Sequence, residues 1–313
     1  MTQAATGSGK YERLLQRCRG LEPVPTAVAY PCEATALSAA VEAARMKLIT
    51  PILVGPADRI VATAISAGLD LGNLEIVDVP NAVAAAARSV ELVRAGRAEV
   101  LMKGSLHTDE LMAAVVSRDG GLRDGRRISH AFVMDVPTYH KVLIVTDGAI
   151  NIAPTLEDKV HICQNAIDLA VSLGREKPKV AILAAVESVN SKMPATLDAA
   201  ALCKMAERGQ IKGALLDGPL AFDNAISREA AETKGIQSEV AGDPDILLAP
   251  DLEAGNILAK QLSFLARADS AGMVLGARVP VILTSRADSV RSRIASCAVA
   301  KLVAHARREA LDM

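Results

Sequence analysis

Short runs of apolar residues, rich in Val, Ile and Leu, recur along most of the chain. Their hydrophobicity is continuous rather than alternating, which is typical of strands that are covered on both faces. The pattern predicts strands at Thr26–Tyr30, Ile49–Gly55, Leu74–Val79, Val100–Lys103, Ile128–Met134, Val142–Thr146, Val180–Ala185, Gly213–Leu216, Ile246–Ala249, Gly272–Leu275 and Pro280–Thr284.

Ala-rich segments with helical apolar spacing lie between most of these strands. Alternation of strand and helix predicts an α/β fold with mostly parallel sheets covered by helices. In such sheets ligands bind beyond the carboxyl ends of the strands, where loops and helix N-termini converge, so functional residues are expected there. The helices are predicted at Glu33–Met46, Asn81–Arg94, Leu156–Leu173, Ala195–Arg208, Glu253–Ala268 and Val290–Arg307.

Composition narrows the class of protein. The 313 residues are 50% apolar, with 35 basic and 36 acidic side chains and only 2% aromatic residues, which excludes a disordered chain and argues against a nucleic-acid binder. At roughly 100–200 residues per domain, the length predicts two domains, with one elongated domain as the alternative. No apolar run approaches the roughly 20 residues of a membrane-spanning helix, and the polar N-terminal segment has no signal-peptide core. We therefore expect a cytoplasmic protein.

The cysteines are widely scattered and form no Cys-x-x-Cys pair. Zinc sites use closer spacing, so we expect reduced thiols, most of them buried. Cys32 follows a predicted strand end, where a reactive thiol is the alternative to burial.

A motif near the N-terminus imitates a phosphate-binding P-loop at Thr6–Lys10. The first glycine of that motif would fall at Ala4, Tyr11 stands where Ser or Thr is required, and no predicted strand precedes it. The sequence also has no Gly-x-Gly-x-x-Gly, His-Glu-x-x-His or Gly-x-Ser-x-Gly motif. These observations argue against a P-loop here.

The predicted strand that ends at Lys103 is the first to be followed by several chemically active residues. Gly104 would let backbone amides approach a phosphate, Lys103 supplies positive charge, and Ser105, His107 and Thr108 supply donors. Alternatively, Thr108 only caps the next helix, with the two acids after it in the first turn. Capping needs only one of these residues, so the group as a whole favours an anion site.

The second such strand end places Asp217 and Asp223 on either side of a rigid Gly-Pro turn. Asp217 is a candidate to orient a neighbouring donor. Asp223 is a candidate to cap the helix that follows.

After the third such strand, Ser285 and Arg286 are adjacent in the sequence. A guanidinium matches a phosphate bidentately, and a serine hydroxyl donates to the same oxygens or to a developing oxyanion. A surface ion pair of Arg286 with Asp288 or another acid is an equally good explanation.

Acidic residues also flank the strand Ile246–Ala249. Asp243, Asp245 and Asp251 suggest a hard-metal site, but their loop setting with neighbouring prolines favours turn and capping roles. We predict no metal site. Four histidines are isolated in the sequence and are explained as surface or core residues: His130, His140, His161 and His305.

Together these segments resemble the phosphate acetyltransferase and phosphate butyryltransferase family, in particular its butyryltransferase-like branch. The similarity starts at about residue 27 and covers most of the chain. Its pieces are weak one by one, but their joint occurrence in this order is specific. They are Lys103–Thr108, Thr146–Asn151, Asn165-Ala166, Pro178–Ala181, Asp217–Leu220, Val240–Gly242, Pro250–Asn256 and Thr284–Arg286.

The resemblance implies a fold related to isocitrate and isopropylmalate dehydrogenases, with two α/β domains and the active site in the cleft between them. Domain 1 would span 1–133 plus 287–313, and an inserted domain 2 would span 134–286. A homodimer or higher homo-oligomer is also implied. The implied reaction is acyl-CoA + phosphate = acyl phosphate + CoA, by direct transfer, with CoA as a substrate, no tightly bound cofactor, and no nucleic-acid or membrane partner.

The resemblance also implies roles for the residues at the strand ends. Arg286 and Ser285 would hold the phosphoryl group, with His107 as the third catalytic residue, and the Lys103 segment would complete the anion pocket. The substrate-binding residues are predicted to be Lys103, Gly104, Ser105, Thr108, Asp217, Asp223 and Asn256.

One departure from the family affects the general base. The acetyltransferase branch carries an acid one to two helical turns after its Ser-Arg pair, often assigned as the base for the thiol. This sequence has Ser292 there, between Arg291 and Arg293. Either Asp288 or His107 takes the proton, or the positive field stabilises the thiolate without a dedicated base.

Two alternative functions follow from the same residues. A metal- and nicotinamide-dependent decarboxylating dehydrogenase of the related fold would need Asp243, Asp245 and Asp251 to bind Mg²⁺ or Mn²⁺. A non-catalytic acyl-CoA or phosphate sensor is favoured by the missing acid. The sequence predicts neither the acyl chain length nor the physiological direction.

Overall fold

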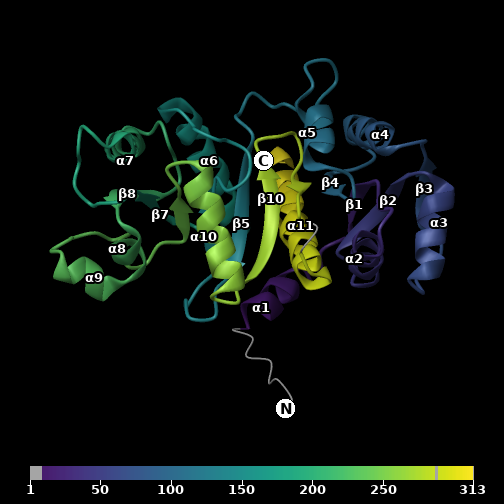
Figure 1. Ribbon diagram of the computed structural model, residues 1–313, viewed down its shortest axis with the longest axis horizontal. Coiled ribbons are helices and arrows are strands. Elements are labelled where there is room, and N and C mark those ends of the chain that lie inside the picture. The colour runs from purple at the N-terminus through teal and green to yellow at the C-terminus, as the bar shows by residue number, and fades with distance from the viewer. Residues whose placement is uncertain (1–8, 286–287, 313) are drawn as a thin grey trace, which may run out of the picture. The chain divides into compact units, whose positions relative to one another are not determined.

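The computed structural model describes residues 9–285 and 288–312. The chain forms two compact units. Unit 1 contains the chain up to Lys10 together with Arg127–Ser270, and unit 2 contains Tyr11–Arg126 together with the chain from Ala271 onward. Figure 1 shows unit 2 in purple to blue and in yellow, and unit 1 in teal to green.

Unit 2 is built on a largely parallel sheet. Its strands lie in the order β3-β2-β1-β4-β11-β10. Among these neighbouring strands, as far as the structure describes them, β10 and β11 pair antiparallel and the other pairs are parallel. Ala29 is paired with Lys103, and Ile282 is paired with Met102, so β1, β4 and β11 end at the same edge. The strands are β1 Val24–Ala29, β2 Ile49–Gly55, β3 Glu75–Asp78, β4 Val100–Lys103, β10 Asp269–Leu275 and β11 Val281–Ile282.

The helices of unit 2 pack closely on this sheet because their inner faces are small. In α2 the buried face includes Ala36, Ala39, Ala40 and Ala43, around Leu37. α11 contacts α2 and β11, whereas α4 contacts β1, β2 and α5. The helices are α1 Lys10–Arg17, which begins at the last residue of unit 1, α2 Ala34–Arg45, α3 Ala57–Ser66, α4 Ala82–Arg94, α5 Thr108–Val116 and α11 Val290–Asp312.

Unit 1 has its own strands, in the order β5-β6-β9-β7-β8. β5 and β6 pair antiparallel, and the remaining pairs are parallel. α6 and α10 pack against β5 and β6, and α7 packs against β7 and β8 (Figure 1). The elements are β5 Ser129–Asp135, β6 Leu143–Thr146, α6 Leu156–Ser172, β7 Lys179–Leu183, α7 Pro194–Glu207, β8 Leu215–Leu220, α8 Phe222–Ile226, α9 Arg228–Thr233, β9 Ile246–Leu248 and α10 Leu252–Phe264.

The predicted α/β class and every predicted strand segment are confirmed, because each segment overlaps a strand of the structure. The chain changes unit after Lys10, after Arg126 and after Ser270. The domains 1–133 plus 287–313 and 134–286 stay a prediction. β11 pairs with β4, and both strands lie in unit 2.

Five of the described helices lie outside the ranges predicted from apolar spacing: α1, α3, α5, α8 and α9. α3 buries only Ile60 and Ala64, and α1 buries only Lys10, so neither has a wide apolar stripe. Within the described ranges, no helix combines the length and apolarity that a membrane span requires.

Candidate functional site

The loop after β4 is tied to the end of β1 by a dense set of hydrogen bonds. The amide of Gly104 donates to the Ala29 carbonyl at 2.8 Å. The Tyr30 carbonyl accepts from the Ser105 amide at 2.9 Å and from the Ser105 hydroxyl at 2.8 Å. The Ser105 hydroxyl also accepts from the Cys32 amide at 3.1 Å. The loop that follows β4 is therefore held rigidly against the loop that follows β1.

Gly104 is required at this position by close packing. A Cβ atom on Gly104 would lie 2.3 Å from the Ala29 carbonyl oxygen and 2.5 Å from that of Tyr30. The amides of Gly104 and Ser105 donate to protein carbonyls. Gly104 therefore has a structural role, and the approach of backbone amides to a phosphate stays a prediction.

Lys103 and Ser105 are buried, whereas His107 and Thr108 are exposed. The Nζ atom of Lys103 lies 3.5 Å from the Gly104 carbonyl oxygen. A positive charge is therefore placed at the carboxyl end of β4, with exposed polar side chains directly after it. This distribution suits a site in which the buried residues shape the loop and the exposed ones meet a ligand.

The start of α5 differs from the capping alternative. His107 occupies the N-cap position and Thr108 is the first helical residue. The Glu110 carboxylate accepts a hydrogen bond from the His107 amide at 2.8 Å. Asp109 and Glu110 lie in the first turn, as expected for acids near a helix N-terminus.

The segment after β11 lies beside the segment after β4, because the two strands are paired neighbours. Thr284 is buried and Ser285 is exposed. The Asp288 carboxylate accepts a hydrogen bond from the Ser285 amide at 2.6 Å. Arg286 lies outside the described residues, so its predicted contacts with phosphate or with Asp288 are not tested.

Ser292, at the position of the family's acid, is bonded to Ser289 at the start of α11. Its amide donates to the Ser289 hydroxyl at 3.1 Å, and the two hydroxyls lie 3.2 Å apart. These contacts close the first turn of α11. Asp288, His107 and a positive field without a dedicated base all stay predictions for the thiol proton.

Unit 1 has an ordered turn of its own at the carboxyl end of β6. The Asp147 carboxylate is 3% exposed and accepts hydrogen bonds from the amides of Ala149, Ile150 and Asn151. The predicted site residue Asn256, in the first half of α10, donates to the Gly148 carbonyl at 2.9 Å. Asn256 therefore joins α10 to this turn, which the sequence analysis did not identify as a site.

Asp217 lies within β8, and Asp223 lies at the start of α8. The Asp217 carboxylate accepts from the Gly218 amide at 2.8 Å. Gly218 and Pro219 are also part of β8, so the predicted Gly-Pro turn is a stretch of strand. Ala221 is the N-cap residue of α8 and Asp223 lies inside its first turn, so the predicted capping role of Asp223 is not what the structure shows.

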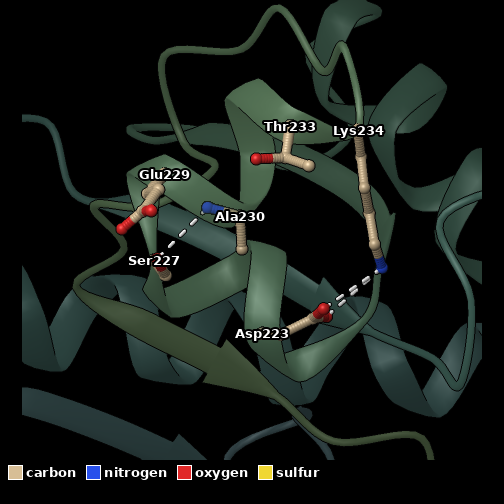
Figure 2. A pocket seen from close by; sticks show the side chains of 6 residues that line it. All are labelled: Asp223, Ser227, Glu229, Ala230, Thr233 and Lys234. Carbon is tan, nitrogen blue, oxygen red and sulfur yellow. Dashed lines mark hydrogen bonds and ion pairs between the residues drawn. The ribbon is translucent and has the colours of Figure 1, made fainter.

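Asp223 instead lines a pocket of about 330 Å³ in unit 1 (Figure 2). The ammonium of Lys234 lies 3.2 Å from the Asp223 carboxylate and 3.1 Å from that of Glu187. Hydrogen bonds from the Asn224 amide and from Lys234 hold the pKa of Asp223 below its usual range. The pocket is lined by Asp223, Ser227, Glu229, Ala230, Thr233 and Lys234.

The acids around β9 have structural partners. Asp243 contacts Lys141 and Lys179 at 3.0 and 2.7 Å. Burial opposes the ionisation of Asp243, but the hydrogen bonds from both lysines outweigh it and lower its pKa. Asp245 contacts Lys141 at 3.0 Å, and Asp251 caps α10 by accepting from the Ala254 amide. In the part of the chain that the structure covers, no group of three or more His, Cys, Asp and Glu side chains could hold a metal ion.

The cysteine thiols are free, and most are buried, as predicted. Burial raises the pKa of Cys32, and the nearby charge of Arg59 only partly opposes this effect. The raised pKa disfavours the thiolate form, so the alternative of a reactive Cys32 is not supported.

Comparison with known proteins gives consistent matches. A family model described as "Phosphate acetyl/butaryl transferase" matches residues 81–301. The chain is 62% identical over 301 residues to a phosphate acetyltransferase of Rhizobium meliloti, covering 96% of this chain and 95% of the relative. It is 42% identical over 294 residues to a phosphate butyryltransferase of Clostridium acetobutylicum, covering 94% and 98%.

Solved structures agree with these relatives. A branched-chain phosphotransacylase from Enterococcus faecalis matches with a TM-score of 0.77 and 31% identity, covering 90% of this chain and 99% of that one. The similarity therefore extends over both units.

Proposed function

The chain belongs to the phosphate acetyl/butyryl transferase family, and from this premise we propose that it transfers an acyl group directly between CoA and inorganic phosphate. The observation that carries the proposal is the high identity to named acyltransferases over nearly the whole chain. The structure supports it with a buried cation and exposed donors at the shared carboxyl edge of β1, β4 and β11.

Direct transfer needs no enzyme nucleophile. A phosphate oxygen attacks the thioester carbonyl, the tetrahedral intermediate collapses, and the C–S bond breaks to release CoA as a thiolate that then takes a proton. The enzyme must hold two anionic substrates together and stabilise the developing oxyanion. Positive charge at strand ends meets both requirements.

We assign the catalytic roles to Ser285, Arg286 and His107. Arg286 and Ser285 would bind the phosphoryl group, which a guanidinium contacts bidentately. His107 is exposed at the N-cap of α5, where an imidazole can donate to the oxyanion or accept the thiol proton.

We assign the substrate-binding residues different roles according to whether their side chains are buried or exposed and what they contact. Lys103 supplies charge, and Thr108 supplies an exposed hydroxyl. Gly104 and Ser105 would act by holding the loop, because their polar groups contact protein carbonyls. In unit 1, Asp217, Asp223 and Asn256 are proposed to bind the other parts of the substrates.

Further properties implied by the family stay proposals. These are a fold related to isocitrate and isopropylmalate dehydrogenases with the site in the interdomain cleft, CoA as substrate without a tightly bound cofactor, a homo-oligomeric state, and a cytoplasmic location. The dehydrogenase alternative is not favoured, since the lysines and the α10 cap engage Asp243, Asp245 and Asp251. The sensor alternative is not favoured by the relatives, which are named as transferases.

The proposal is tested by incubating the protein with acetyl-, propionyl- or butyryl-CoA and phosphate, without metal or nicotinamide, and measuring thiol release. We expect phosphate-dependent release, together with an acyl phosphate that hydroxylamine traps. A matched reaction without phosphate controls for thioester hydrolysis. Binding of CoA without any release would support the sensor and contradict the proposal.

A further inference from the structure

Arg293 is a buried cation directly beside the end of β11. It lies in the first turn of α11, its exposed fraction is 3%, and the buried residues Ile294 and Ala295 follow it. Burying a guanidinium is unfavourable unless hydrogen bonds compensate. A charged side chain at this position therefore needs a specific explanation.

The guanidinium of Arg293 holds two consecutive residues. One terminal nitrogen donates to the Thr284 hydroxyl at 2.7 Å, and the other donates to the Ser285 carbonyl at 2.9 Å. Because the guanidinium is planar and rigid, two such bonds fix the orientation of the Ser285 peptide relative to α11. A single ammonium group would not impose the same constraint.

Asp288 holds Ser285 from the other side. Its carboxylate accepts from the Ser285 amide at 2.6 Å, and its own amide donates to the Ser285 carbonyl at 3.2 Å. Both backbone polar groups of Ser285 are thus bonded, while its side chain is exposed. Hydrogen bonds to both backbone groups fix the Ser285 peptide and therefore restrict the direction in which the Ser285 hydroxyl points.

The contacts of Arg293 are incomplete for a purely structural residue. Its Nε atom has no hydrogen-bond partner within the described ranges. Burial lowers the pKa of Arg293, and the charges of Asp288 and Glu33 oppose this effect. The Nε donor of Arg293 is thus buried without a partner among the described residues, while the two terminal nitrogens bond Thr284 and Ser285.

We propose that Arg293 is a positioning residue that sets the Ser285 backbone so that the Ser285 hydroxyl meets the phosphoryl group. The proposal rests on the function proposed above and adds to it a residue that does not itself touch substrate. It predicts that loss of Arg293 weakens the use of phosphate more than the use of acyl-CoA.

The experiment compares Arg293→Lys, Arg293→Met and Thr284→Val with the wild type. Lys301→Met is a matched control, because Lys301 is another buried cation on α11 that donates to two backbone carbonyls, those of Leu21 and Lys47, both at 2.8 Å. Thermal unfolding and circular dichroism establish the folded fraction of each variant. Steady-state kinetics then give KM for phosphate, KM for acyl-CoA and kcat separately.

We expect both Arg293 variants to raise KM for phosphate by about tenfold or more, the effect of losing hydrogen bonds from a charged donor. Thr284→Val, which removes one of the two acceptors, should give a smaller rise of about threefold. KM for acyl-CoA should stay within about threefold in each variant. Lys301→Met should lower the unfolding temperature but leave KM for phosphate unchanged.

The proposal is overturned if folded Arg293→Lys keeps the wild-type KM for phosphate, or if both KM values rise equally in the Arg293 variants. Equilibrium stabilisation by inorganic phosphate separates this failure from failure of the proposed function. If the wild type releases no thiol, the proposed function is wrong. If phosphate nevertheless stabilises the wild type but not Arg293→Met, that result supports the positioning role. Equal stabilisation of both proteins, or of neither, overturns it.

Discussion

Replacing Gly104 by alanine tests how the β4 loop is held. The new Cβ atom would lie 2.3 Å from the Ala29 carbonyl oxygen, and contacts below 3.0 Å essentially never occur for real Cβ atoms. Both nearest neighbours are backbone atoms, so no side chain can move aside. The loop must withdraw by about 0.7 Å merely to reach that limit, which is the difference between the two distances.

This displacement stretches the bonds that fix the loop. The Gly104 amide to Ala29 bond and the Ser105 amide to Tyr30 bond, now 2.8 and 2.9 Å, would approach or pass 3.5 Å. Overpacking costs about 1–3 kcal/mol. Weakening two hydrogen bonds costs about 0.5–1.5 kcal/mol each. We expect Gly104→Ala to lower the free energy of unfolding by about 2–6 kcal/mol.

The same shift displaces Lys103 and the start of α5, so kcat/KM should fall about tenfold or more even in the folded fraction. Urea unfolding and thiol-release kinetics measure the two effects. Gly55→Ala is the control, because its Cβ would meet ordinary contacts of 3.4 Å or more at the end of the neighbouring strand β2. A Gly104→Ala protein with wild-type stability and activity would refute the packing argument.

Three further substitutions have expected outcomes. Arg286→Ala should lose roughly 2–4 kcal/mol of transition-state stabilisation, about 30- to 1000-fold in kcat/KM, and a loss below about threefold would contradict its role. Asp243 has a lowered pKa in the folded protein, so its stabilisation is complete above the unfolded pKa of about 3.9 and is lost as pH falls below it. Asp243→Asn should therefore destabilise at pH 7, and the difference from wild type in urea unfolding should shrink between about pH 4 and pH 2; a pH-independent difference would contradict this. Asp251→Ala removes the N-cap of α10 and should lower the unfolding free energy by about 0.5–2 kcal/mol, whereas Asp251→Asn should retain most of it.

The strands were predictable because burial on both faces leaves a continuous apolar run that few other structures produce. The β1 and β4 segments illustrate this, since all four residues of β4 are buried. α3 was not predictable in the same way, because two buried residues in ten do not define a stripe. The neighbours of β11 could not be predicted from its position in the sequence, because its pairing with β4 is a long-range property.

The candidate site shows a different limit. Residue types in the sequence indicated two candidate site segments, Lys103–Thr108 and Thr284–Ser285. In the structure these segments follow the neighbouring strands β4 and β11. The residue types alone did not show which of the hydrogen-bond donors in these segments bond to the protein's own carbonyls. Arg293 has a weak signal in the sequence, because it is a charged residue directly before the apolar pair Ile294-Ala295 of a predicted helix.

Ser105 shows why sequence alone cannot separate these cases. Its hydroxyl follows a lysine and a glycine after a buried strand, the pattern expected of a phosphate ligand, yet it bonds to Tyr30 and Cys32. A strand end exposes carbonyl and amide groups that need partners as much as a ligand does. Short polar side chains there are shared between the protein backbone and the substrate, and the outcome depends on distances of a few ångströms. In this loop the buried hydroxyl of Ser105 satisfies the backbone, whereas His107 and Thr108 are exposed.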